Sequence, residues 1–128
     1  MQSIYPVLKY DDAHAAIEFL DKAFGIERLQ VHEDDDGRVV HAELRFGDQV
    51  VMLSSAGAGD PVYDQGLGRT TVYVVVDEVD PLYERAKAAG AEIVLEPTDQ
   101  DYGSRDFTVR DPEGNLWSLG TYRPAADG

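Results

Sequence analysis

A histidine and a glutamate stand two positions apart in the strand-like stretch VVHAELRF, as His41 and Glu43. Side chains at i and i+2 of a β-strand point to the same face of the sheet, so the two can interact. An imidazole oriented by a carboxylate can act as a general base near neutral pH. The alternative is a solvent-facing pair with cross-strand contacts to Arg45, Arg28 or His32. Both interpretations are open at this point.

Other groups that could do chemistry are scarce in this chain. It has no cysteine and three histidines, so any metal site would need His, Asp or Glu as ligands. A metal site made of His41, Glu43 and His32 would need three ligands to converge from two strands, which disfavours it. His14 falls on the polar face of an expected helix, and we expect it to be exposed.

The net charge excludes two classes of partner. The 128 residues include 25 acidic and 11 basic ones, for a formal net charge of −14. This charge repels nucleic-acid phosphates and anionic membranes, and it would attract cationic ligands, although a solvated acidic surface is the simpler explanation. No apolar run approaches the ~18 residues of a membrane span, and the chain start shows no signal-peptide pattern, so we expect a cytoplasmic protein.

The elements that would position these residues occur in the same order twice. In the first half we expect strands at residues 5–10, 29–32, 39–46 and 49–53, with a helix at residues 13–24. In the second half we expect strands at residues 71–76, 91–95, 106–110 and 116–122, with a helix at residues 79–89. Asp11 or Asp12 can cap the first helix, Gly25 can end it, and Asp36 with Gly37 suits a hairpin turn. Two βαβββ modules predict an α+β fold.

A constant offset relates the two halves. Tyr5 aligns with Thr71, and Met52 aligns with Ser118, both at 66 positions (71 − 5 and 118 − 52). We therefore expect a single domain over residues 1–128 made of two modules. Module one covers about residues 3–54 and module two about residues 70–123, with a linker or lid at residues 55–69 and a frayed tail at residues 124–128.

The paired modules and three sequence stretches carry a family resemblance. AIEFLDKAFG, GRVVHAELRFGDQVVML and DYGSRDFTVRDPEGNLW resemble the glyoxalase/bleomycin resistance/dioxygenase (vicinal oxygen chelate) superfamily, and within it the PhnB-like or glyoxalase-like single-chain subgroup. The resemblance covers residues 5–123. It implies a curved mixed sheet around a cavity, and a homodimer. Members include lyases, dioxygenases, epimerases, thiol transferases and metal-free drug-binding proteins, so the fold alone does not define an activity.

The metal-dependent members take two ligands from each module, one on its first strand and one on its last. The resemblance places these four positions at Tyr5, Met52, Thr71 and Ser118. Hydroxyl and thioether groups are poor ligands for Mg²⁺, Zn²⁺, Ni²⁺ or Fe²⁺. We therefore expect no metal site and no cofactor.

The cavity implied by the resemblance would be lined by the sheet faces turned away from the helices. By strand alternation we expect Val39, His41, Glu43 and Arg45 on that face, and Val40, Ala42, Leu44 and Phe46 toward the helix. The candidate ligand-binding residues are Tyr5, Val7, His41, Glu43, Met52, Thr71, Tyr73, Tyr102, Arg105 and Ser118. Trp117 alternates with Ser118 and is expected in the core. Arg105 could bind a ligand carboxylate, or pair with Asp101 or Asp111.

These features favour a metal-independent small-molecule binding protein, similar to the bleomycin resistance proteins that sequester a cationic antibiotic. A planar or cationic ligand is expected to bind reversibly and without turnover. The alternative is a lyase- or isomerase-type enzyme, with a non-standard metal site or with His41 and Glu43 as acid-base groups. A sensor or accessory protein for a metabolite is a third possibility.

Overall fold

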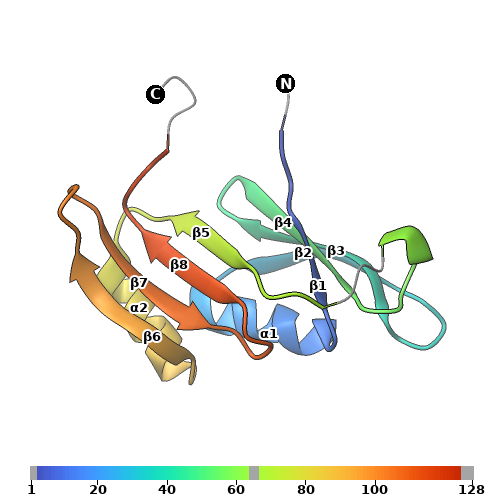
Figure 1. The fold of residues 1–128 in the computed structure, drawn as a ribbon. Coiled ribbons are helices and arrows are strands. Elements are labelled where there is room, and N and C mark those ends of the chain that lie inside the picture. The colour runs from blue at the N-terminus through green and yellow to red at the C-terminus, as the bar shows by residue number, and fades with distance from the viewer. Residues whose placement is uncertain (1–2, 64–66, 125–128) are drawn as a thin grey trace. The chain divides into compact units, whose positions relative to one another are not determined.

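The computed structural model describes residues 3–63 and 67–124 and divides the chain into two compact units at the Gly68–Arg69 boundary. Each unit holds a four-stranded mixed sheet and one α-helix, coloured blue to green for the first unit and yellow to red for the second (Figure 1). The predicted α+β class with two βαβββ modules is confirmed. Among the described residues, no helix has the length and apolarity needed to cross a membrane.

The first unit follows the predicted order of elements. They are β1 (Val7–Tyr10), α1 (Ala13–Phe24), β2 (Glu27–Glu33), β3 (Val39–Phe46) and β4 (Gln49–Ser55), followed by a short 3-10 helix, η1 (Pro61–Tyr63). The sheet has the order β1-β4-β3-β2, with β1 parallel to β4 and the other pairs antiparallel. Strand β1 begins two residues later than predicted, because Pro6 has no N–H to donate to the sheet. The Pro6 carbonyl still accepts from the N–H of Met52 at 3.2 Å.

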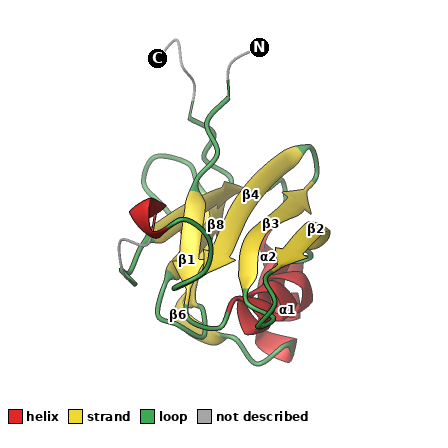
Figure 2. Ribbon diagram, turned by 90° about the vertical axis from the view of Figure 1, so that its right-hand side faces the viewer, coloured by secondary structure: helices red, strands yellow, loops and turns green. Residues whose placement is uncertain are grey.

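Helix α1 begins and ends where the sequence predicts. The Asp12 carboxylate accepts from the N–H of Ala15 at 3.1 Å, and Gly25 has a φ of 73°, a left-handed conformation that ends the helix. Figure 2 shows α1 next to β2 and β3, which it contacts. The core between helix and sheet includes Ala13, Ala16, Ile17, Leu20, Ala23 and Phe24 from α1, and Leu8, Tyr10, Val39, Ala42, Leu44 and Leu53 from the sheet.

The predicted turn between β2 and β3 is confirmed. Gly37 has a φ of 81°, and its N–H donates to the carbonyl of Asp34 at 3.0 Å. The Asp34 carboxylate accepts from the N–H groups of Arg38 and Asp36 at 3.0 and 2.9 Å. These contacts, led by the one from Arg38, lower the pKa of Asp34. In the acidic run at residues 34–36, the Asp34 carboxylate therefore stabilises the turn.

The prediction that Val39 faces away from the helix is wrong. The register between β2 and β3 shifts between the His32–His41 and Glu33–Val39 pairs, so Val40 is an extra residue in a β-bulge. The bulge turns Val39 to the buried side, where its N–H donates to Ser55 Oγ at 3.0 Å. From His41 to Arg45 the predicted alternation is confirmed, because Ala42 and Leu44 are buried and His41, Glu43 and Arg45 are not. Val40 and Phe46, which were predicted to face the helix, are half-buried.

The second unit repeats the pattern of the first. Its elements are β5 (Thr71–Val75), α2 (Val79–Ala88), β6 (Glu92–Asp99), β7 (Arg105–Arg110) and β8 (Leu116–Gly120), in the sheet order β5-β8-β7-β6. Val7 pairs with Met52 in the first sheet, and Tyr73 pairs with Ser118 in the second, so the offset of 66 positions (73 − 7 and 118 − 52) is preserved in the strand register. Strand β6 extends through Pro97, which an edge strand tolerates.

The turn of the DPEGN motif is built around the buried side chain of Asp111, which is 5% exposed. Its Oδ1 accepts from the N–H groups of Glu113 and Asn115, both at 3.0 Å. Its Oδ2 accepts from Nδ2 of Asn115 and from the indole Nε1 of Trp117, both at 3.1 Å. Asn115 Oδ1 in turn accepts from the N–H of Thr70 at 3.0 Å. The Asp111 carboxylate thus connects the end of β7 with the start of β8 and, through Asn115, with the residue before β5. The predicted burial of Trp117 is confirmed.

The predicted linker and tail are only partly covered. The structure describes linker residues 55–63 and 67–69 and tail residue 124, and the rest of these segments lies outside the described residues.

Candidate functional site

Most of the predicted site residues fall on the sheet face of their own unit that lies away from the helix. In the first unit this face holds the candidates Val7, His41, Glu43 and Met52, together with Lys9, and is called the first face below. In the second unit this face holds the candidates Tyr73 and Ser118, together with Asp106 and Thr108, and is called the second face. Each face is described by itself.

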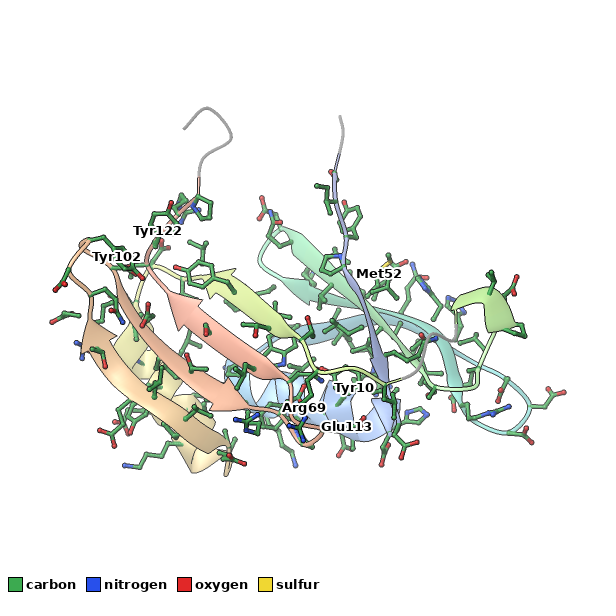
Figure 3. All side chains as sticks on the ribbon, viewed as in Figure 1. Tyr10, Met52, Arg69, Tyr102, Glu113 and Tyr122 are labelled. Atoms are coloured by element: carbon green, nitrogen blue, oxygen red, sulfur yellow. The ribbon has the colours of Figure 1, made fainter. Side chains whose placement is uncertain are left out.

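The first face has a row of paired residues across three strands. Met52 on β4 (Figure 3) pairs with Val7 on β1 and with Glu43 on β3. Tyr5 lies just before β1, next to Pro6, and its side chain is exposed. The row therefore combines apolar side chains with one carboxylate.

The predicted contact between His41 and Glu43 is present. His41 Nε2 lies 2.8 Å from Glu43 Oε2, and the side chains are 41% and 30% exposed. The imidazole of His32, the residue paired with His41, stacks on the His41 ring at 6.2 Å between centroids. When Nε2 of His41 carries the hydrogen and donates it to Glu43, Nδ1 is the nitrogen that can accept a proton. Arg45, an alternative predicted partner, instead pairs with Glu27 at 3.7 Å.

Lys9 is a member of the first face that sequence reasoning did not select. Its Nζ donates to Ser54 Oγ at 3.0 Å, and Ser54 is buried. The alternation of Tyr5, Val7 and Lys9 along the first strand was the available signal. Lys9 places one positive charge on this face.

The second face is organised by hydroxyl groups. Tyr73 pairs with Ser118, Ser118 pairs with Thr108, and the hydroxyls of Ser118 and Thr108 are 2.9 Å apart. The Tyr73 hydroxyl donates to the carbonyl of Tyr122 at 2.7 Å. Burial raises the pKa of Tyr73, and a hydrogen bond with Ser104 offsets part of this effect. The phenol is therefore a neutral hydrogen-bond donor at physiological pH.

Gly120 makes room for the side chains of Tyr73 and Asp106. A Cβ atom at Gly120 would lie 2.7 Å from Asp106 Cβ and 2.9 Å from the Tyr73 hydroxyl oxygen. The Asp106 carboxylate accepts from Nε2 of Gln100 at 3.0 Å. Tyr73 and Asp106 therefore both lie against Gly120, a position that has no side chain.

Two further tyrosines lie beside this face, where the chain leaves β8. The rings of Tyr102 and Tyr122 are 5.9 Å apart between centroids and nearly perpendicular, at 87° (Figure 3). Tyr102 was a candidate from sequence, and Tyr122 was not. The alternation of Ser118, Gly120 and Tyr122 at the end of the last strand was the signal for it.

Comparisons with known proteins agree with this architecture. The sequence model of the Glyoxalase/Bleomycin resistance protein/Dioxygenase superfamily matches residues 5–119. The chain belongs to this superfamily. The narrower similarity to the PhnB-like subgroup stays a prediction.

Relatives of this superfamily member span nearly its full length. An uncharacterized protein of Mycobacterium bovis is 38% identical over 92% of this chain and 82% of its own. A probable lactoylglutathione lyase of Vibrio cholerae is 25% identical over 91% of this chain and 87% of its own. The crystal structure of TioX from Micromonospora sp. ML1 has a TM-score of 0.82 and 31% identity, and covers 96% of this chain and all of that one (100%).

The side chains at the four positions that the family resemblance predicts for metal ligands are poor ligands for a metal ion. In the first unit the groups are a phenol at Tyr5 and a thioether at Met52; in the second they are the hydroxyls of Thr71 and Ser118. The Ser118 hydroxyl is already hydrogen-bonded to Thr108. Within residues 3–63 and 67–124, no group of three or more His, Asp or Glu side chains is placed to hold a metal ion.

Arg105 lies on the α2 side of its sheet. Its guanidinium donates to Asp80 Oδ1 on α2, at 3.0 Å from Nη2, and to Asp99 Oδ1 at 3.1 Å. Both contacts raise the pKa of Arg105, with Asp80 the larger cause. The prediction that Arg105 pairs with Asp101 or Asp111 is wrong, because the packing of α2 on the sheet brings Asp80 next to β7.

Proposed function

We propose that this superfamily member binds a small molecule reversibly and without a metal ion. The observation that carries the proposal is the set of side chains at Tyr5, Met52, Thr71 and Ser118, which supplies no imidazole and no carboxylate. Neutral hydroxyl and thioether groups bind Mg²⁺, Zn²⁺, Ni²⁺ and Fe²⁺ poorly. Members of the superfamily bind small molecules and often form dimers, and a homodimer is part of this proposal.

The chemistry of the second face supports a ligand that is aromatic and carries positive charge. Tyr73 and Tyr102 expose aromatic surface in the second unit, and exposed apolar patches often mark a binding site. The Asp106 carboxylate and the net charge of −14 favour a cation over an anion.

Calorimetric titration of the untagged protein with Ni²⁺, Zn²⁺, Mn²⁺ and Fe²⁺ tests the absence of a metal site. We expect affinities weaker than about 1 mM, because no four-ligand set is available. The matched control is the variant with Tyr5→His, Met52→Glu, Thr71→His and Ser118→Glu, which restores the ligand types of the metal-dependent members and should gain binding. Stoichiometric metal in the natural protein, measured by mass spectrometry, would refute the proposal.

A screen of cationic aromatic compounds tests reversible binding. We expect binding by calorimetry, with every bound compound recovered chemically unchanged after incubation. A compound that is converted to product would favour an enzyme.

The contact of 2.8 Å between His41 and Glu43 supports acid-base catalysis as a second candidate function. The similarity to a probable lactoylglutathione lyase points in the same direction. The second candidate predicts that, for any compound the protein turns over, His41→Ala lowers kcat/KM by about 10²–10⁴-fold, the usual effect of losing a general base.

Two further variants separate catalysis from binding at this pair. Glu43→Gln removes the charge that orients the imidazole and should cause a smaller loss of kcat than His41→Ala. His14→Ala, at an exposed histidine that contacts the carbonyl of Gly37 at 2.9 Å, should leave kcat/KM unchanged. Equal rates for His41→Ala and the natural protein would remove His41 from the chemistry.

A further inference from the structure

Three tyrosine side chains and one carboxylate gather where the chain leaves β8. We call Tyr73, Tyr102, Tyr122 and Asp106 the tyrosine cluster. The hydroxyl of Tyr73 donates to the carbonyl of Tyr122, whose ring meets that of Tyr102 edge to face. Asp106 lies next to this group, because its Cβ and the Tyr73 hydroxyl oxygen both come within 3 Å of the position that a Cβ atom of residue 120 would take.

The backbone around the cluster is held in place. The N–H of Tyr122 donates to Ser104 Oγ at 3.1 Å, and Ser104 is buried. Together with the contact from Tyr73, this bond uses both backbone polar groups of Tyr122. Tyr102 sits in a tight turn in which the N–H of Gly103 donates to the carbonyl of Gln100 at 3.0 Å. A site with fixed walls loses little entropy when a ligand binds.

The aromatic rings of the cluster are accessible from solvent. Tyr73, Tyr102 and Tyr122 are 38%, 66% and 52% exposed. Two perpendicular rings form a corner, and the face of a tyrosine ring attracts a cation that lies within about 6 Å of its centre.

The positive side chains nearest in sequence are occupied elsewhere. Arg105 binds Asp80 and Asp99, and Arg123 pairs with Asp77 at 3.6 Å. The Asp106 carboxylate has a neutral partner, the Gln100 amide. The cluster therefore keeps negative charge and ring faces available to a cation from outside the chain.

We propose that the tyrosine cluster binds the ammonium group of a ligand, with a methylated ammonium as the best-fitting class. This inference rests on the proposed function and names the charged part of its ligand. A corner of perpendicular rings suits a compact, weakly hydrated cation, whereas a flat aromatic group would need a parallel ring face. A divalent metal ion would need several oxygen ligands, and the cluster offers one carboxylate.

Titration with tetramethylammonium chloride, followed by amide chemical shifts in two-dimensional NMR, tests the site. We expect saturable shifts at Gly103 and Tyr122. Sodium chloride at the same ionic strength controls for screening, and tert-butanol controls for size and apolar character without charge. Neither control compound should produce saturable shifts.

Substitutions at Tyr102 separate the ring from the fold, because this exposed side chain lies in a turn. We expect Tyr102→Leu to weaken tetramethylammonium binding about fivefold or more, and the matched variant Tyr102→Phe to stay within about twofold, because it keeps the ring face. Asp106→Asn should also weaken binding, while Asp48→Asn at an exposed turn of the first unit should not.

Two results would overturn the inference: tert-butanol producing the same shifts as tetramethylammonium, or Tyr102→Leu binding as tightly as the natural protein. A failure here differs from a failure of the proposed function. Loss of the ammonium site alone would leave the metal titration and the ligand screen with their expected results, whereas a stoichiometric metal would overturn the proposed function and leave the tetramethylammonium result standing.

Discussion

Replacing Asp111 with alanine is expected to lower the free energy of unfolding by about 3–5 kcal/mol. The substitution leaves the indole N–H of Trp117, the side-chain amide of Asn115 and two backbone N–H groups without their acceptor in a buried turn. Each buried donor left unsatisfied costs about 1–3 kcal/mol, and local rearrangement recovers part of the sum. Urea unfolding followed by far-UV circular dichroism measures the change.

Two matched variants make the Asp111 result interpretable. Asp111→Asn keeps one acceptor oxygen and should lose less stability than the alanine variant. Asp101→Ala removes an exposed carboxylate from another turn of the same unit and should stay within about 0.5 kcal/mol of the natural protein. A loss below about 1 kcal/mol for Asp111→Ala would show that the carboxylate does not hold this turn together.

Replacing Gly120 with alanine is expected to destabilise the protein by about 1–3 kcal/mol, the usual range for overpacking a core. The new Cβ would lie 2.7 Å from Asp106 Cβ, which belongs to the neighbouring strand and has little freedom to move. The Tyr73 hydroxyl, at 2.9 Å, would also be displaced and would lose its bond to the Tyr122 carbonyl. Thermal unfolding and the tetramethylammonium titration should both report the change.

Gly68→Ala is the matched control for Gly120→Ala. No atom lies within 4 Å of a Cβ at Gly68, and its φ is outside the left-handed region, so its stability should stay within about 0.5 kcal/mol. Equal stability of the two alanine variants would mean that β7 and β8 accommodate the new Cβ atom at Gly120 without a cost in free energy of unfolding.

The features predicted correctly depend on neighbours along the chain. The Asp12 cap and the Gly25 terminus of α1 are determined within one helical turn, and the Gly37 turn within four residues. The contact between His41 and Glu43 joins side chains two positions apart on one strand. Local geometry alone brings such groups together, so periodicity and residue type were sufficient.

The errors arose where a distant segment decides the outcome. Val39 turned inward because the pairing of β3 with β2 contains a bulge, and strand alternation in one sequence does not encode the register of two strands. Arg105 pairs with Asp80, which lies 25 positions away on α2, and not with the nearer Asp101. The packing of a helix on a sheet determines that contact.

The sequence by itself determined the order of elements and the repeat at an offset of 66 positions, because both follow from residue type and spacing. Only the tertiary structure decided that Asp111 binds Trp117 and that Tyr73, Tyr102, Tyr122 and Asp106 form one cluster. The physical reason is that strand pairing sets which side chains from separate segments meet. A hydrogen bond from Tyr73 to Tyr122 spans 49 positions of the chain, and β5 must lie beside β8 for it to form.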